Sequence, residues 1–167
     1  MTQTPRGSFA ASQRVDDPIH LTVSNGFTLG STILTLDGAL PVEHLSPGDR
    51  IITRDRGMVL LRGLAARVAR VETVRIAAGS LGHSAPPADA VIPAGHRILL
   101  RDWRAEALSG RKQALVPARD LIDGEFVRQG PIREMRLCDL FFDAAHILYV
   151  NGLELACDPV EPLRRAA

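Results

Sequence analysis

Cysteine is scarce and long apolar runs are missing, and both absences narrow the class of protein. The two cysteines, Cys138 and Cys157, are too few for a disulfide scaffold or a thiolate metal site. No apolar stretch approaches the roughly 20 residues that a membrane span requires. Residues 1–20 also lack the apolar core of a secretory signal peptide. We therefore expect a protein without a membrane anchor, either cytoplasmic or exported by a route that uses no such signal.

The sequence also gives no indication of a metal, cofactor or nucleic-acid site. Its five histidines show no metal-ligand spacing, and no cofactor is predicted. Lys and Arg total 20 against 19 Asp and Glu, a net charge of +1. This balance, with Arg scattered along the chain, gives no support to a nucleic-acid or membrane partner. The histidines are His20, His44, His83, His96 and His146.

What the sequence does hold is a series of short apolar runs separated by turn residues. Hydrophobic residues make up 46% of the 167 residues, which fits one globular domain. Many short strands and few helix-length patterns predict an all-β fold. We expect a flexible leader over 1–24, with a short edge strand at 20–24, a domain over 25–158 and a tail over 159–167. Further strands are predicted at 58–61, 68–77, 135–142 and 146–150, with a surface helix or an ordered loop at 103–111.

The region from 25 to 55 gives the clearest local structure. An apolar strand over 31–36 is followed by Asp37-Gly38, the type of dipeptide that joins hairpin strands. A short apolar segment over 40–45 then leads to Ser46-Pro47-Gly48-Asp49, where the fixed φ of proline next to glycine indicates a chain reversal. A second strand begins at residue 50.

This region resembles the opening block of the Hint (hedgehog/intein) domain, in particular its bacterial form. The likeness rests on Phe27, Gly30-Ser31, Leu36-Asp37-Gly38, Pro41-Val42-Glu43 and the spacing from Leu45 to Asp49. It implies a compact, pseudo-twofold β horseshoe with both chain ends near a central cleft. It also implies descent from self-cleaving or self-splicing proteins, whose substrate is their own flanking polypeptide. In that family a nucleophilic Cys precedes the Phe, but here the position is Gly26.

Two later segments are similar to further blocks of the family. His96 matches a histidine that protonates the leaving amide nitrogen, a role that suits imidazole. A small hydroxyl residue normally stands three positions earlier, where this chain has Pro93. Asp139 matches a carboxylate that activates the nucleophile, and His146, seven residues on, matches a histidine that assists the C-terminal side. The alternatives are a structural histidine at 96, a surface Asp at 139 and a loop-end His at 146.

The C-terminal reaction of inteins depends on a final His-Asn pair, and this chain has Ala156 and Cys157 there. Asn cyclisation is therefore not available at this end. Many bacterial and hedgehog-type members also lack the pair and perform only the N-terminal half of the chemistry. The difference at Ala156 and Cys157 alone does not exclude self-cleavage.

The glycine at 26 has the larger consequence for function. The N-terminal reaction moves an acyl group onto a thiol or hydroxyl of the same residue, and glycine has neither. If Asn25-Gly26 has no functional role, we interpret it as a flexible turn. A displaced thiol is an alternative nucleophile, although strand alternation would point Cys138 away from the face that Asp139 uses. Cys157 is the other candidate.

Two hypotheses for the function follow from these substitutions. The first is an autoprocessing domain that is impaired or inactive in this chain. The second is a non-catalytic Hint-fold module with a binding or structural role.

Overall fold

The computed structural model describes residues 26–82 and 84–159. The predicted leader, the edge strand at 20–24 and all but the first residue of the predicted tail lie outside the described residues. Within the described part, no helix is both long enough and apolar enough to cross a membrane.

Short strands dominate the described residues, which confirms the all-β prediction. The only α-helix among them is α3, and two 3-10 turns, η1 and η2, accompany it. The elements are β1 (Gly26–Thr28), β2 (Thr32–Thr35), β3 (Gly38–Pro41), η1 (Val42–His44), β4 (Arg50–Thr53), β5 (Gly57–Leu60), β6 (Gly63–Val71), β7 (Thr73–Ile76), β8 (Ala90–Pro93), β9 (Arg97–Leu100), α3 (Trp103–Ser109), β10 (Ala114–Pro117), η2 (Ala118–Leu121), β11 (Val127–Gln129), β12 (Arg133–Phe141), β13 (His146–Val150) and β14 (Leu153–Cys157).

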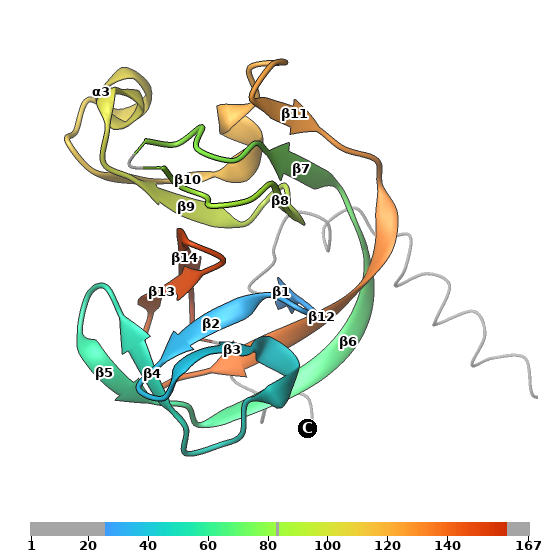
Figure 1. The fold of residues 1–167 in the computed structure, drawn as a ribbon, viewed down its shortest axis with the longest axis vertical. Coiled ribbons are helices and arrows are strands. Elements are labelled where there is room, and N and C mark those ends of the chain that lie inside the picture. Colours follow the sequence, from blue (N-terminus) through green and yellow to red (C-terminus); the bar gives the residue numbers. More distant parts are fainter. Residues whose placement is uncertain (1–25, 83, 160–167) are drawn as a thin grey trace, which may run out of the picture.

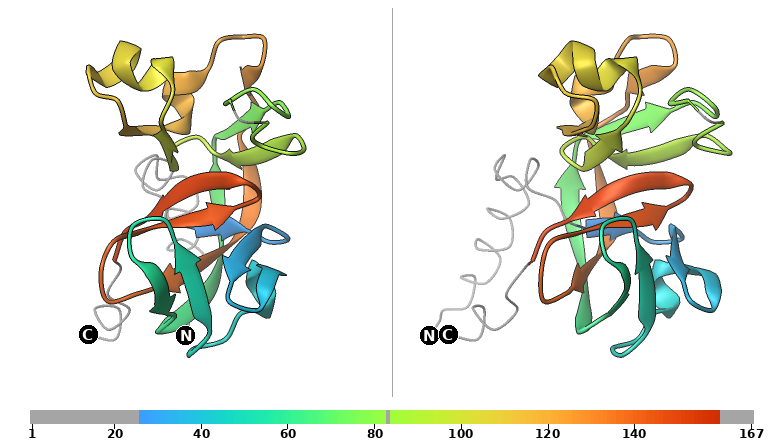
Figure 2. Two further views of the ribbon diagram at one scale, coloured as in Figure 1. Left: turned by 60° about the vertical axis from the view of Figure 1, so that its left-hand side comes forward. Right: turned by 90° about the vertical axis from the view of Figure 1, so that its left-hand side faces the viewer.

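The strands form three sheets in a curved arrangement. A three-stranded sheet has the order β1-β12-β6, an eight-stranded sheet has the order β10-β9-β14-β13-β2-β4-β5 with β3 on β2, and the last has the order β11-β7-β8. Figure 1 shows β6 and β12 running side by side along one side, from the lobe of β2–β5 to the lobe of β7–β11 and α3. Figure 2 shows the β13–β14 hairpin between these lobes. This confirms the predicted horseshoe.

The turns of the opening region form as predicted. Strands β2 and β3 pair from Thr35↔Gly38 to Thr32↔Pro41. Gly38 has φ +107°, a positive value that glycine adopts readily because it has no Cβ. The hydroxyl of Thr35 donates to the carbonyl of Gly38 at 2.7 Å and closes the hairpin. At the second turn, the carboxylate of Asp49 accepts from the Ser46 amide at 2.8 Å.

The structure resolves the alternatives for 103–111 in favour of a helix. The side chain of Asp102 caps the first turn of α3 by accepting from the Arg104 amide at 3.0 Å. Gly110 ends the helix in the left-handed region, with φ +75°. Aspartate before the helix and glycine after it are the usual start and stop residues.

The predicted strand over 68–77 is wrong as a single element. The chain leaves one sheet at Val71 and enters another at Thr73. The break falls at Glu72, whose carbonyl accepts from the Ala94 amide at 2.9 Å. This bond is one step beyond the Thr73–Pro93 pair, so Glu72 already hydrogen-bonds to the chain that follows β8.

The prediction of a flexible turn at Asn25-Gly26 is wrong at Gly26. This residue is buried in strand β1, and its Cα is opposite that of Asp139 in β12. A Cβ added to Gly26 would lie only 2.9 Å from Cβ of Leu137. Glycine is required here because β1 lies so close to β12, and the closeness gives the residue a fixed place in the sheet.

We expect Gly26→Ala to destabilise the fold by about 1–3 kcal/mol, the usual cost of overpacking a filled site. Gly63→Ala is the matched control, because Gly63 also pairs with β12, opposite Phe141. Its added Cβ would lie 3.4 Å from the nearest ring carbon of that side chain. Urea unfolding of both variants tests the prediction, and equal midpoints would contradict the close approach at Gly26.

Candidate functional site

Gly26 occupies the position where the family resemblance places the cleavage junction, and it lies against an ion pair. Nε of Arg67, in β6, donates to Oδ2 of Asp139 at 2.7 Å. A Cβ on Gly26 would be 3.1 Å from Oδ1 of Asp139 and 3.1 Å from Nη2 of Arg67. The structure thus brings Gly26 and Asp139 together as the sequence predicted. It also shows that charged side chains border the space that a nucleophilic side chain would enter.

Sequence reasoning missed Arg67. In the β6–β12 register, Asp139 is opposite Ala65 and Leu137 is opposite Arg67. Arg67 is therefore a diagonal neighbour of Asp139, close enough for a long side chain to reach. The pairing depends on a register between strands that are 72 residues apart in the chain, and no local motif specifies it.

The ring of His96 is buried beside the junction. Only 1% of the residue is exposed, and its ring centroid lies 5.0 Å from that of Phe27. Nε2 of His96 lies 2.9 Å from the carbonyl oxygen of Ala156. A carbonyl only accepts, so this nitrogen carries a proton and donates. The imidazole therefore joins the beginning of the domain to its last strand.

Burial also decides the charge of His96. It lowers the pKa of the ring to about 4, against smaller opposing effects of hydrogen bonds to the backbone of Ala156 and Gly26. The imidazole is consequently neutral near pH 7. A general acid works best with a pKa near the operating pH. His96 lies beside Gly26, but its pKa is lower than that of an effective general acid at neutral pH.

Pro93 is buried in β8, at the position where the family carries a hydroxyl. The residue opposite it is Thr73, which does have a hydroxyl. That hydroxyl donates to the carbonyl of Pro131 at 2.8 Å. The nearest threonine across the ladder is therefore committed to a structural hydrogen bond.

Both thiols are buried. Leu137 and Asp139 both border the position of a Cβ on Gly26, so alternation places the side chain of Cys138 on the opposite face of β12. Burial is the main cause that raises the pKa of Cys138 and raises that of Cys157 to about 12. The thiol of Cys157 donates to the Leu140 carbonyl at 3.6 Å. Neither thiol is in a state that favours a thiolate.

The third predicted residue, His146, has a different partner. Its Nδ1 lies 3.0 Å from Oδ2 of Asp55, and Phe142 packs edge-on against its ring. Among the described residues, no hydrogen bond or ion pair joins it to His96 or Asp139. Its Cα is opposite that of Cys157, near the end of β14. The structure therefore does not gather the three predicted residues into one hydrogen-bonded cluster.

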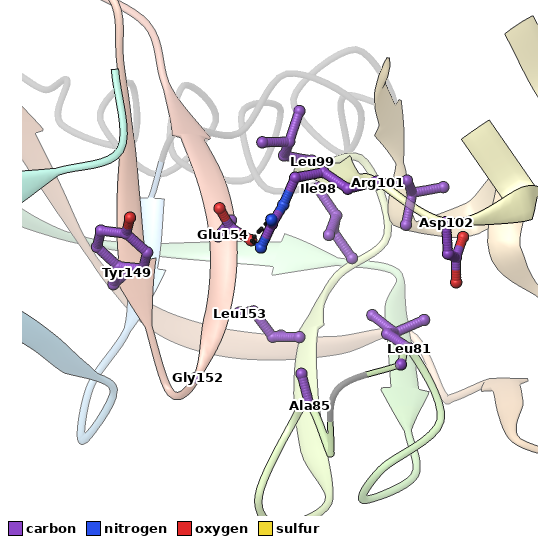
Figure 3. Close-up of a pocket in the computed structure, with 12 residues that line it drawn as sticks. Leu81, Ala85, Ile98, Leu99, Arg101, Asp102, Tyr149, Gly152, Leu153 and Glu154 are labelled. Carbon is purple, nitrogen blue, oxygen red and sulfur yellow. Dashed lines mark hydrogen bonds and ion pairs between the residues drawn. The ribbon is translucent and has the colours of Figure 1, made fainter. Parts of the chain in front are cut away.

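A separate cavity of about 260 Å³ lies where β9 meets the β13–β14 hairpin (Figure 3). It is lined by leucines and by charged groups that are already paired. Glu154 accepts from Nη2 of Arg101 at 2.8 Å and lies 2.9 Å from Nε of Arg54. Neither Gly26, His96 nor Asp139 lines this cavity. Its charged groups are held in ion pairs with Arg54, Arg101 and Arg104, so the cavity adds no reactive group to the junction.

These features define an all-β domain in which Gly26 is packed between β12 and the ring of His96, and comparison with known proteins identifies the family. The sequence matches the Hint domain family over residues 25–157, and the chain belongs to that family. No curated protein matches the sequence.

Solved structures with the same fold are distant in sequence. The solution structure of a bacterial intein-like domain from Clostridium thermocellum is 14% identical, has a TM-score of 0.55, and covers 81% of this chain and 99% of its own. The MchDnaB-1 intein is 14% identical with a TM-score of 0.50, over 78% of this chain and 98% of its own. A splice-inactive variant of the AceL NrdHF class 3 split intein is 11% identical with a TM-score of 0.50, over 83% and 100%. At these identities the likeness shows the fold.

The low pKa of His96 predicts a specific pH dependence of stability. The folded-state pKa, about 4, lies below the unfolded value of 6.5. Between these pH values the unfolded chain binds more protons than the folded protein. The stabilising contribution of His96 to the free energy of unfolding is therefore complete above pH 6.5 and is lost as the pH falls to 4. We expect a loss of about 3 kcal/mol from this group.

Urea unfolding across this pH range, compared with His96→Gln, measures the effect. The variant lacks the titrating ring, so the stability difference between the two proteins should shrink as the pH falls. Parallel stability curves would show that the ring of His96 is not held neutral by burial.

Proposed function

We propose that this Hint domain has kept the scaffold of a self-processing junction and no longer performs thiol-initiated self-cleavage. The observation that carries the proposal is the surrounding of Gly26. An acyl shift requires a thiol or hydroxyl on that residue. Here the residue has no side chain, and Leu137, Asp139 and Arg67 crowd the position of its missing Cβ.

The partner groups support the same conclusion. Asp139 would be the base, but its carboxylate is already held in an ion pair with the guanidinium of Arg67. His96 would be the acid, but it is neutral near pH 7. The chain therefore combines a missing nucleophile with a neutral imidazole and an ion-paired carboxylate.

A relocated thiol is not favoured. Cys138 lies on the other face of β12 from Asp139, and the thiol of Cys157 is protonated at neutral pH because its pKa is raised to about 12. Direct attack on the peptide bond before Gly26 would require the thiol to move out of the core and lose its proton.

The alternative function is a non-catalytic module with a binding or structural role. The observation in its favour is that the junction is packed and paired rather than left open. If the domain were active, its substrate would be its own flanking polypeptide. The two functions differ in whether restoring the nucleophile restores the reaction.

Intact-mass spectrometry of an N-terminal fusion, with and without dithiothreitol, tests the proposal. We expect the native sequence to stay whole under both conditions. Gly26→Cys combined with Arg67→Ala supplies a nucleophile and removes one of the side chains that border it, while Leu137 stays in place. This variant should release the fusion in a thiol-dependent way if the rest of the junction is intact. Absence of cleavage in the double variant would instead favour the non-catalytic module.

Two matched substitutions sharpen this experiment. In the double variant, Asp139→Asn should slow any release, whereas Asp143→Asn should not, because Asp143 pairs with Arg62 at the surface away from Gly26. Cleavage of the native fusion that stops in Cys138→Ser or Cys157→Ser would overturn the proposal, because it would show a relocated thiol at work.

A further inference from the structure

A second cavity, of about 420 Å³, lies between the β4–β5 turn and the β12–β13 turn. Its charged lining consists of Asp55, Arg56, Arg62, Asp143 and His146, and the rest of the lining is apolar. None of these residues contacts the junction at Gly26 in any described interaction. The cavity is therefore a separate candidate site.

Asp55 fixes the ring of His146. The two carboxylate oxygens of Asp55 accept from the Ile147 amide at 2.8 Å and lie 3.0 Å from Nδ1 of His146. Partial burial alone would raise the pKa of Asp55, but these hydrogen bonds outweigh it and hold that pKa below its usual range. An ionised carboxylate only accepts, so Nδ1 carries the proton and Nε2 carries the lone pair in the neutral ring.

The other ring nitrogen of His146 is available to a ligand. Nε2 has no hydrogen-bond partner among the described residues, and it is not one of their fully buried polar atoms that lack a partner. The ring itself is buried, with 8% of the residue exposed. His146 lines the cavity, and Asp55 occupies its Nδ1, so Nε2 is the ring nitrogen left for a bound molecule.

One guanidinium in the lining of this cavity makes no described pair. Arg62 and Asp143 pair at 2.8 Å, and Asp55 pairs with His146. The guanidinium of Arg56 makes no hydrogen bond or ion pair with a described residue. With His146 neutral, the charged lining sums to zero. Protonation of His146 leaves a surplus of one positive charge, so the cavity favours an anion and a proton together.

We propose that this cavity binds a small oxyanion, a carboxylate or a phosphate, together with one proton. The proton lies between Nε2 of His146 and an oxygen of the anion, and the guanidinium of Arg56 pairs with the anion. Asp55 supports the protonated ring from the opposite side. The proposal does not depend on whether the domain cleaves itself.

The test uses the full chain labelled with ¹⁵N and titrated with sodium acetate or inorganic phosphate, while the ring nitrogens of His146 are followed by NMR. We expect a saturable shift of the Nε2 signal. Acetate affinity should fall as the pH rises, by up to about tenfold per pH unit, the limit for uptake of one proton. No shift, or an affinity that does not depend on pH, would overturn the proposal.

Substitution of Arg56 tests whether its unpaired guanidinium contributes to binding. Arg56→Gln should weaken binding by about tenfold, as expected for loss of a charged hydrogen bond. Arg50→Gln is the control, because Arg50 is in the same hairpin and does not line the cavity. Equal effects of the two substitutions would contradict a site at Arg56. Both side chains are exposed, so neither variant depends on repacking the core.

The source of the anion is decided with a short peptide that ends in a free carboxylate and its C-terminal amide. Tighter binding of the acid than of acetate, with no binding of the amide, would assign the site to a chain end. Equal binding of acetate and the peptide acid would assign it to a small free anion. Binding of the amide as tightly as the acid would contradict oxyanion recognition.

Discussion

Strand β1 lies so close to β12 at Gly26 that one added carbon would sit 2.9 Å from Cβ of Leu137. The arrangement of the junction follows from this approach. The β6–β12 register brings Arg67 onto Asp139 beside the glycine. The ring of His96 then spans from the backbone of Gly26 to that of Ala156. A scaffold that could hold a nucleophile is closed around a residue that has none.

The two central histidines show how environment separates similar side chains. His96 is enclosed by backbone and Phe27, and burial holds its ring neutral. His146 is held by a carboxylate and borders a cavity. The first therefore serves to fix the junction, whereas the second has the accessible nitrogen that binding or proton transfer needs. The family resemblance assigns His96 to the N-terminal cleavage and His146 to the C-terminal side, and the structure gives the two rings separate surroundings.

Local signals in the sequence predicted much of the fold. Turn residues such as Asp37-Gly38 and Ser46-Pro47-Gly48-Asp49 act within a few positions, so they mark chain reversals without knowledge of the rest of the structure. The break at Glu72 was missed because it depends on pairing with β8, which is distant along the chain. The same limit explains Gly26, whose strand conformation depends on pairing with β12.

The site was predicted less completely for the same reason. The motif spacing pointed to Gly26, His96 and Asp139, and the structure places all three around the junction. Arg67 and Asp55 belong to no motif, because their roles arise from strand register and from the meeting of two distant turns. The catalytic roles of His96, Asp139 and His146 stay predictions. The structure adds the burial and the ion pairing of these groups, which cannot be obtained from residue identity alone.

A crystal structure of Gly26→Cys would test most directly whether the junction is closed to a nucleophile. The account predicts that β1 moves away from β12, so that the substituted residue no longer sits within contact of Leu137 and the Arg67–Asp139 ion pair is disturbed. A structure in which the cysteine side chain is accommodated with β1, Leu137 and the ion pair unmoved would contradict it.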